Sequence, residues 1–539
     1  MSSADVQDLE FVKNIFDNVH GFIPLTQVEC DIVNHDLFQR LRNIKQLGLL
    51  EYVFPGAIHN RFNHSLGVMH IADKMVVTLQ EKNLQKKGRS IPSDTRQIIR
   101  LAALLHDIGH YPLSHIIEVP VRKDAKARFH QLPPPEGHLE VKILGEKTES
   151  EGSEQIAPLV AGSSSHTLNH QLHKPINDSL DYAHHERMAS IVINKSGIRD
   201  ILLDSGELDQ EQVDDICRII AGSYSGFETA IIHSELDADR FDYLLRDSKQ
   251  TGVIYGLFDL DQIIRRLEYL EPTTSDLDEG TSGLCVDYRG QKAVEDYLLA
   301  RYFLYSTVIY QKTSIGFHHM ASMVYEGLLE RGHVPSYFDL IEIFDKGDIG
   351  HYMNFDDSFF WEILKAITSD PEKIEEEGKY QYASTLDTGE YRYPSDFIID
   401  CSKRLLMRRP LKLVKEEQAI VQKSSSTSSS LAHLHYGPAI ETICREADIP
   451  REWYITPKVE QDITELSPFA PIDDIDSYMR LRSDSIKIKK PDSSTIFLID
   501  DPASIVRILS DKQLNIFAVY TKDEDYKERL CEVIDNCQS

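Results

Sequence analysis

The chain has 539 residues, of which 41% are hydrophobic, so it is long and apolar enough for a sizeable core and for roughly two to four domains. Lys and Arg total 58 against 87 Asp and Glu, which gives a formal net charge of −29. That charge argues against general nucleic-acid binding, because an acidic surface repels phosphates.

The cysteines and the N-terminus give no sign of export. The seven cysteines form no CxxC pair, so neither a disulfide framework nor a zinc ribbon is predicted. The first residues lack a basic stretch followed by an apolar one, and no apolar run approaches the length of a membrane span. We therefore expect no membrane attachment and a cytoplasmic protein, or a nuclear one in a eukaryotic cell.

The first strongly predicted helix begins near His64. Val68, Ile71, Met75 and Leu79 follow at helical spacing, so His64 starts the buried stripe of this helix. A single histidine in such a place is more often a hydrogen-bonded core residue than a ligand.

A second apolar helix covers residues 101–105 and leads into the adjacent pair His106 and Asp107, with Gly109 and Pro112 marking its end. Burying two polar groups at the end of a Leu/Ala helix is costly unless they bind something. The pair therefore indicates a functional site.

Residues 118–181 form a polar segment that contains three consecutive prolines and Ser-rich stretches. We expect a solvated insertion, with a lid over the active site as its favoured role. Its histidines match no metal-site spacing; they are His130, His138, His166, His170 and His173.

Helical patterns cover residues 213–270 and 291–331, with a short strand predicted at 284–288. Within the first of these, Asp239, Tyr243 and Asp247 are spaced four apart and share one helical face. The plain alternative is that Asp247 and the nearby Asp242 face water.

The predicted fold class is mainly α, with a small α+β region at the C-terminus. Residues 332–422 are predicted as a helical extension and the Ser-rich residues 423–432 as a linker. Residues 433–539 complete the chain, with short strands expected at 486–489, 495–499 and 515–520.

Two imidazoles and two carboxylates from these segments form a candidate metal tetrad: His64, His106, Asp107 and Asp239. That ligand set suits a hydrolytic divalent metal such as Mn, Fe, Zn or Mg. A run of carboxylates on one face also repels itself unless a cation or hydrogen-bond donor lies there.

The segments 61–65, 106–115, 185–186 and 239–243 resemble the HD-domain phosphohydrolases. Residues 38–48 and 52–64 are similar to those of deoxynucleoside triphosphate (dNTP) triphosphohydrolases, a group that includes the animal enzyme with a sterile alpha motif. The resemblance covers roughly residues 10–120 and 182–320, and it implies an HD-domain helical fold for residues 1–331. We expect no sterile alpha motif before it, because residues 13–21 already look like the start of the catalytic domain.

The resemblance implies cleavage of a dNTP, dGTP included, into a deoxynucleoside and tripolyphosphate, with the tetrad holding the metal. It makes His115 the general acid, a role suited to a group that titrates near neutrality. Auxiliary active-site histidines are His110 and His185. Residues that contact the triphosphate are Arg61, Arg240 and Arg301, whose planar groups bind phosphate bidentately. Residues that surround the sugar are Gln46, Leu47, Tyr243 and Asp247.

Two departures from the family pattern bear on substrate and regulation. Ile309 and Gln311 replace a tyrosine and a histidine of the animal enzyme, which affects base and sugar selection. A guanine-nucleotide activator site is partly kept, at Lys13, Gln39, Arg42 and Arg409. Its acidic residue is replaced by Asn34, whose amide offers one acceptor where a carboxylate accepts two guanine donors.

Three functions stay open at this point. The favoured one is a metal-dependent dNTP triphosphohydrolase that lowers dNTP levels and assembles as a homo-oligomer. The second is an HD hydrolase for another nucleotide, an alarmone or a phosphodiester. The third is a nucleotide sensor, for which the acid His115 would be unnecessary.

Overall fold

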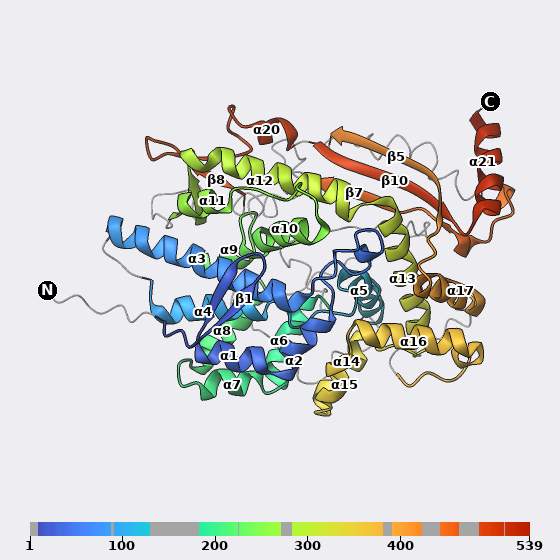
Figure 1. Cartoon of the computed structure of the whole chain (residues 1–539), viewed down its shortest axis with the longest axis horizontal. Helices are drawn as coiled ribbons and strands as arrows, with labels where there is room; N and C mark the ends of the chain where they lie inside the picture. Colours follow the sequence, from blue (N-terminus) through green and yellow to red (C-terminus); the bar gives the residue numbers. More distant parts are fainter. Residues whose placement is uncertain are drawn as a thin grey trace, which may run out of the picture.

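The computed structural model describes residues 9–87, 91–129, 183–224, 226–270, 283–380, 391–422, 442, 444–462, 485–510 and 512–538. Figure 1 shows a body of helices with strands β5, β10 and β7 along its upper edge. The predicted fold class, mainly α with a small sheet-containing C-terminal region, is confirmed. Within these ranges no helix combines the length and apolar content needed to cross a lipid bilayer.

The described chain opens with an antiparallel hairpin, β1 (Lys13–Asp17) and β2 (Gly21–Leu25), followed by the short helices α1 (Gln27–Asn34) and α2 (Asp36–Gln39). Glu29 forms a capping box with Thr26 at the start of α1. The same buried carboxylate accepts hydrogen bonds from Arg100 at 2.7 Å. This ion pair fixes the N-terminal elements to the helical core.

The core is built around α3 (Arg61–Lys87), which packs against α4 (Ser93–Leu105) and α10 (Ala238–Thr251). The predicted apolar stripe of α3 is buried, which confirms this helix. Helix α4 ends at Leu105, four residues before the predicted end at Gly109, and His106 is its C-cap. The His-Asp pair therefore lies in the turn after the helix.

The predicted insertion begins later than expected. Residues from His115 to Phe129 form α5, and Ile117, Val121 and Ala125 bury its inner face. The segment between residues 118 and 129 is thus helical core rather than polar insertion, because its apolar residues recur at helical spacing. The rest of the predicted insertion, with its five histidines, lies outside the described residues.

Helices α6 (His185–Lys195) and α8 (Gln210–Ile220) pack against each other, and α8 also packs against α4. The chain then passes through α12 (Gln291–Leu304), the π-helical turn η4 (Tyr305–Ile309) and α13 (Lys312–Glu330). The remaining described helices of this body are α7 (Ile198–Asp204), α9 (Phe227–Ile232), α11 (Leu260–Arg266), α14 (Tyr337–Asp345), α15 (Ile349–Met353), α16 (Asp357–Ser369) and α17 (Ser395–Leu406).

One sheet joins β3 (Leu267–Leu270), β4 (Gly283–Asp287), β8 (Lys487–Lys489) and β9 (Thr495–Phe497), in that order, with β4 and β8 parallel. The strands predicted near 284–288, 486–489 and 495–499 are therefore confirmed. Because β8 pairs with β4, the C-terminal region completes a sheet that begins in the helical body.

The second sheet corrects the predicted helical extension. Residues 332–422 are helical only as far as α17 and end in the long strand β5 (Lys412–Gln422). Strand β5 pairs with β10 (Lys512–Thr521), which also pairs with β6 (Tyr454–Ile455) and β7 (Lys458–Asp462). Its partner comes about 100 residues later, so local periodicity carries no trace of the pairing. The predicted linker at 423–432 lies outside the described residues, and α20 (Ile505–Leu509) and α21 (Glu524–Gln538) flank β10.

Candidate active site

Two histidines and a carboxylate converge where α3, α4 and α10 meet. Ligand-type atoms of His64, His106 and Asp239 all lie within 4.8 Å of one another. His64 Nε2 is 2.9 Å from Asp239 Oδ1, and His106 Nε2 is 3.9 Å from the same oxygen. Burial lowers the pKa of His64, but hydrogen bonds to Asp239 and Asp242 outweigh it and raise the pKa to about 10. The carboxylates around His64 thus favour a positive charge beside them.

The donor atoms of this group fit a divalent metal. His106 Nδ1 pairs with the carbonyl oxygen of Ala103 at 2.8 Å, while its Nε2 is buried without a hydrogen-bond partner among the described residues. An unpaired buried nitrogen costs free energy that a bound cation would offset. Nitrogen and carboxylate donors without thiolates suit Mn, Fe, Zn or Mg.

Asp107, the fourth predicted ligand, lies beside the group and is held by Arg61. Its Oδ1 is 3.4 Å from His106 Nε2, and its Oδ2 accepts a hydrogen bond from Arg61 Nη1 at 2.6 Å. Burial raises the pKa of Asp107, but the neighbouring positive charge, chiefly that of Arg61, holds it well below its usual range. The structure therefore brings all four predicted metal positions together, with Arg61 at their edge.

A second cluster joins three histidines to Glu118. Glu118 Oε2 accepts from His115 Nδ1 at 2.7 Å, and Oε1 lies 3.0 Å from His185 Nδ1. The backbone N–H of His185 also donates to Glu118 Oε1 at 3.0 Å. His110 stacks on His185, with 4.2 Å between ring centroids. His115 and His185 begin α5 and α6, so one carboxylate ties two helix starts together.

The members of this cluster differ in exposure and charge. The side chain of His115 is 31% exposed, whereas that of His110 is fully buried, so His115 is the one a ligand can reach. Burial lowers the pKa of His115, although its bond to Glu118 acts in the opposite direction. Burial, together with the charges of Arg61 and His185, holds the pKa of His110 well below its usual range. His110 is therefore neutral near pH 7.

The loop before His115 is held in an uncommon conformation. Leu113 and Ser114 have φ values of 50° and 57°, in the left-handed region that residues with a Cβ rarely adopt. Asp357 Oδ1 accepts from the Leu113 backbone N–H at 2.6 Å, and Ser114 Oγ accepts from Arg61 Nε at 2.8 Å. These bonds stabilise the loop that joins the two clusters.

Comparisons with known proteins find a family match in the part of the chain that carries most of this site. Residues 61–163 match the HD domain family. The SAMHD1 homolog of Dictyostelium discoideum, named a deoxynucleoside triphosphate triphosphohydrolase, is 28% identical over 259 residues, which are 47% of this chain and 39% of that protein. Within this region the chain is therefore similar to HD-domain proteins, and its similarity to a protein named a dNTP triphosphohydrolase covers less than half of either chain.

Other matches to this chain are broader but less specific. An uncharacterized protein of Methanocaldococcus jannaschii is 30% identical over 302 residues, which are 56% of this chain and 47% of that protein. The chain thus spans about half the length of these curated relatives, or less. The crystal structure of a phosphohydrolase from Bacteroides thetaiotaomicron shares the fold, with a TM-score of 0.59 at 22% identity, covering 95% of this chain and 100% of that one.

The predicted sugar-contacting residues lie on α10 and in the loop before α3. Tyr243 and Asp247 follow Asp239 along α10, and both are buried. Asp247 Oδ1 lies 2.7 Å from His59 Nε2. Gln46 is buried and Leu47 half-buried. Asp247 is therefore part of a buried polar pair rather than a water-facing carboxylate.

The predicted triphosphate-binding arginines are differently placed. Arg240 is buried and turned to Asp237, at the start of its own helix, and to the carbonyl oxygen of Ser234. Arg301 is half-buried on α12, and its charge opposes the burial that raises the pKa of Tyr243. Arg61, Arg301 and Arg240 thus all lie near predicted site residues, and Arg240 is also engaged in an ion pair with Asp237.

The residues that depart from the family pattern have local structural roles. Ile309 ends the π-helical turn η4. The side chain of Gln311 accepts from the Ser314 backbone N–H at 3.0 Å and so caps α13. The side-chain oxygen of Gln311 is therefore engaged at the start of α13.

The predicted activator residues lie on the surface around the hairpin and α2. Lys13, Asn34 and Arg42 are exposed, and Gln39 is half-buried. Arg42 Nε donates to Gln39 Oε1 at 2.7 Å. The fifth, Arg409, is exposed after the end of α17.

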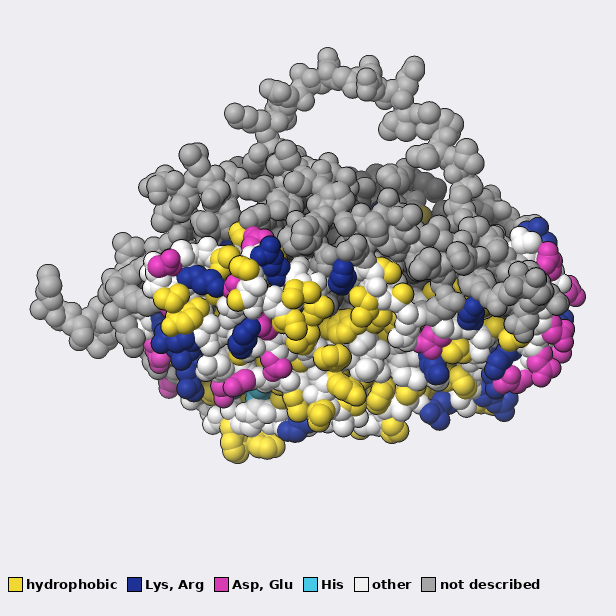
Figure 2. Space-filling model, turned by 90° about the horizontal axis from the view of Figure 1, so that it is seen from above, with side chains coloured by type: hydrophobic (Ala, Val, Ile, Leu, Met, Phe, Trp, Pro, Cys, Tyr) yellow, Lys and Arg dark blue, Asp and Glu magenta, His cyan; other side chains and the backbone are white. Residues whose placement is uncertain are grey.

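Sequence reasoning missed three residues that the structure places at the site: Glu118, Asp242 and His59. Glu118 follows His115 by three positions, a helical spacing that signals contact. Asp242 was considered only as a water-facing residue, yet it is fully buried. Figure 2 shows almost no histidine on the described part of the face seen from above, in keeping with the burial of most histidines of the two clusters.

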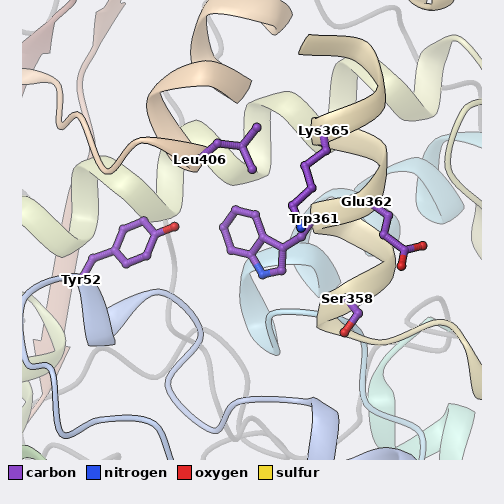
Figure 3. Close-up of a pocket in the computed structure, with 6 residues that line it drawn as sticks. All are labelled: Tyr52, Ser358, Trp361, Glu362, Lys365 and Leu406. Carbon is purple, nitrogen blue, oxygen red and sulfur yellow. The ribbon is translucent and has the colours of Figure 1, made fainter. Parts of the chain in front are cut away.

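A cavity of about 410 Å³ lies elsewhere, between the loop of Tyr52 and helices α16 and α17. Figure 3 shows Tyr52 and Trp361 on opposite sides of it, with Leu406 beside them. None of its lining residues belongs to either cluster, so it is not the place where the chemistry described above would occur.

Proposed function

We propose that this chain hydrolyses deoxynucleoside triphosphates at the α-phosphorus, releasing a deoxynucleoside and tripolyphosphate. One observation carries the proposal: the metal-type group and the His115–Glu118 pair are contiguous through His110. His110 Nε2 is 4.0 Å from Asp107 Oδ1, and its ring centroid is 4.8 Å from that of His115. A metal site beside a supported imidazole is what hydrolysis with a protonated leaving group requires.

The metal would be held by His64, His106, Asp107 and Asp239, and when bound it supplies a water of lowered pKa and polarises a phosphoryl oxygen. Arg61 supports Asp107 and presents positive charge to a polyphosphate. Tyr243, Asp247, Gln46 and Leu47 surround the sugar in this proposal.

His115 is the proton donor. Its Nδ1 is held by Glu118, which leaves Nε2 to protonate the departing 5′ oxygen of the nucleoside. Glu118 also stabilises the protonated imidazole, because a carboxylate favours the charged form of its partner. The similarity to proteins named dNTP triphosphohydrolases supports the dNTP substrate class.

A second candidate is hydrolysis of another phosphorylated nucleotide. Gln311 is the observation that favours it, because its side chain caps α13 where the animal enzyme has a histidine. A homo-oligomeric state and activation by a nucleotide both stay predictions.

The test is to incubate the metal-loaded protein with each dNTP in H₂¹⁸O and to resolve the products by chromatography and mass spectrometry. Attack at the α-phosphorus yields the unphosphorylated nucleoside and tripolyphosphate that carries the label. Asp107→Asn should abolish turnover, whereas Asp73→Asn, in a buried ion pair of α3 away from both clusters, should keep it.

Release of orthophosphate, or of a nucleoside monophosphate with pyrophosphate, would reject cleavage of the bond between the α-phosphorus and the 5′ oxygen. Absence of turnover with all four dNTPs, with and without GTP, would reject the dNTP substrate class. Turnover that depends on GTP would support the activator site despite Asn34.

A further inference from the structure

Asp242 collects hydrogen-bond donors from three separate elements. It lies on α10, three residues after Asp239, and is fully buried. Its Oδ2 accepts from His64 Nδ1 at 2.7 Å, and its Oδ1 lies 2.6 Å from His20 Nε2. Arg246 donates from Nε to Oδ2 at 2.8 Å and from Nη2 to Oδ1 at 3.0 Å. One carboxylate therefore links the N-terminal hairpin, α3 and α10.

The hairpin turn that carries His20 is itself fixed. Asp17 Oδ1 accepts from the backbone N–H groups of Val19 and His20, at 2.8 and 2.9 Å. Asp17 Oδ2 accepts from Arg246 Nη1 at 2.8 Å. Two contacts thus tie the turn to α10: Arg246 binds Asp17 of the hairpin, and His20 of the turn binds Asp242.

Helix α3 can approach this carboxylate only because position 67 has no side chain. A Cβ at Gly67 would lie 1.9 Å from Asp242 Oδ1 and 2.5 Å from Arg246 Nη2. Both distances are far below van der Waals contact, so the close packing of α3 on α10 and the bond from His64 to Asp242 depend on this glycine.

We infer that Asp242 is a positioning residue for the metal, which orients the His64 ring, and that the N-terminal hairpin takes part through His20. The inference rests on the metal site of the proposed function. A carboxylate only accepts, so His64 Nδ1 carries the hydrogen and Nε2 faces Asp239 as a metal ligand would. A partner of this kind fixes the orientation and raises the basicity of a ligating imidazole.

The test measures Mn²⁺ binding to the metal-stripped 539-residue chain, with the paramagnetic resonance signal of free Mn²⁺ as the readout. Asp242→Asn keeps the size of the side chain but replaces one acceptor oxygen by a donor, so at least one of its three partners loses its bond. We expect the Kd for Mn²⁺ to rise about 10- to 100-fold. Asp73→Asn is the matched control, because Asp73 pairs with Arg96 and Arg100 and touches no proposed ligand.

A second variant, His20→Ala, removes only the partner on the hairpin and guards against misfolding of Asp242→Asn. We expect the Kd of His20→Ala for Mn²⁺ to rise by less than about tenfold. It should still be higher than the Kd of the Asp73→Asn control. Unchanged Mn²⁺ affinity in both variants would overturn the role of Asp242 while leaving the metal site intact. A wild-type protein that binds no Mn²⁺ would instead reject the metal site itself, and with it this inference. Mn²⁺ binding without dNTP turnover would count against the substrate proposal alone.

Discussion

Glu118 decides the chemistry of the second cluster, because one carboxylate serves two histidines. His115 and His185 both direct Nδ1 toward it, so their Nε2 atoms are left for other partners. The sequence identified both histidines from the resemblance but not the group that orients them. A buried carboxylate with two imidazole partners is a stronger sign of function than any of the three residues alone.

The Glu118→Gln variant should lower kcat by about 100-fold, at the low end of a general acid's contribution. The bond to Glu118 raises the pKa of His115, so its loss should lower that pKa further. An acid must be protonated to act, and activity is lost as the pH rises through its pKa. The alkaline limb of the plot of kcat against pH should therefore move to lower pH.

Asp124→Asn provides the control, because Asp124 is another carboxylate of α5 and pairs with Arg128 at 2.6 Å. It should leave the position of the alkaline limb unchanged. An identical pH profile for Glu118→Gln and the wild type would contradict the assignment of His115 as the acid supported by Glu118.

At the scale of elements, the approach of α3 to α10 brings His64 to Asp239. The apolar stripe of α3 was readable from the sequence because helical periodicity is local. The register of α3 on α10 could not be read from the sequence, because it depends on a contact between Gly67 and Asp242, which are 175 positions apart. The same limit applies to β5, whose partner β10 lies about 100 residues later in the chain.

Gly67→Ala should destabilise the protein by about 1–3 kcal/mol, the usual range for overpacking. Gly316→Ala is the matched change, in the interior of α13, where a Cβ would meet Tyr520 at an ordinary 3.6 Å. That substitution should be neutral or stabilising by up to about 1 kcal/mol, because alanine favours helix more than glycine does. Urea unfolding monitored by circular dichroism measures both, and equal effects would refute the close-approach argument.

At the scale of the whole molecule, a bound metal would join helices α3, α4 and α10, which are far apart in sequence. Mn²⁺ at 100 times its Kd should stabilise the folded state by about 2.7 kcal/mol. Thermal unfolding with Mn²⁺ and after treatment with EDTA should therefore give a higher Tm for the metal-loaded protein. The Asp107→Asn variant should lose most of that difference, and a wild-type Tm indifferent to metal would speak against the site.

The C-terminal strands are a second whole-molecule feature, since β8 pairs with β4 and β10 with β5. Tyr520 of β10 also donates from its hydroxyl to the carbonyl oxygen of Lys312 at 2.7 Å, at the start of α13. A chain that ends at residue 462 would leave β4 and β5 with unpaired edges, which favour aggregation. Light scattering should detect aggregates of this shortened chain, whereas a monodisperse product with the wild-type Tm would mean that the helical body folds without these strands.

The sequence by itself determined the residue chemistry and the local elements: two imidazoles and two carboxylates in a metal-type set, the helices that carry or directly precede them, and the short C-terminal strands. Periodicity and capping act over a few residues, so they can be read directly. Tertiary structure alone decided which groups orient the site. His64 and Asp242 are 178 positions apart in the sequence, and His20 and Asp242 are 222 apart. A hydrogen bond between residues so distant in sequence depends on the packing of whole helices rather than on any local pattern.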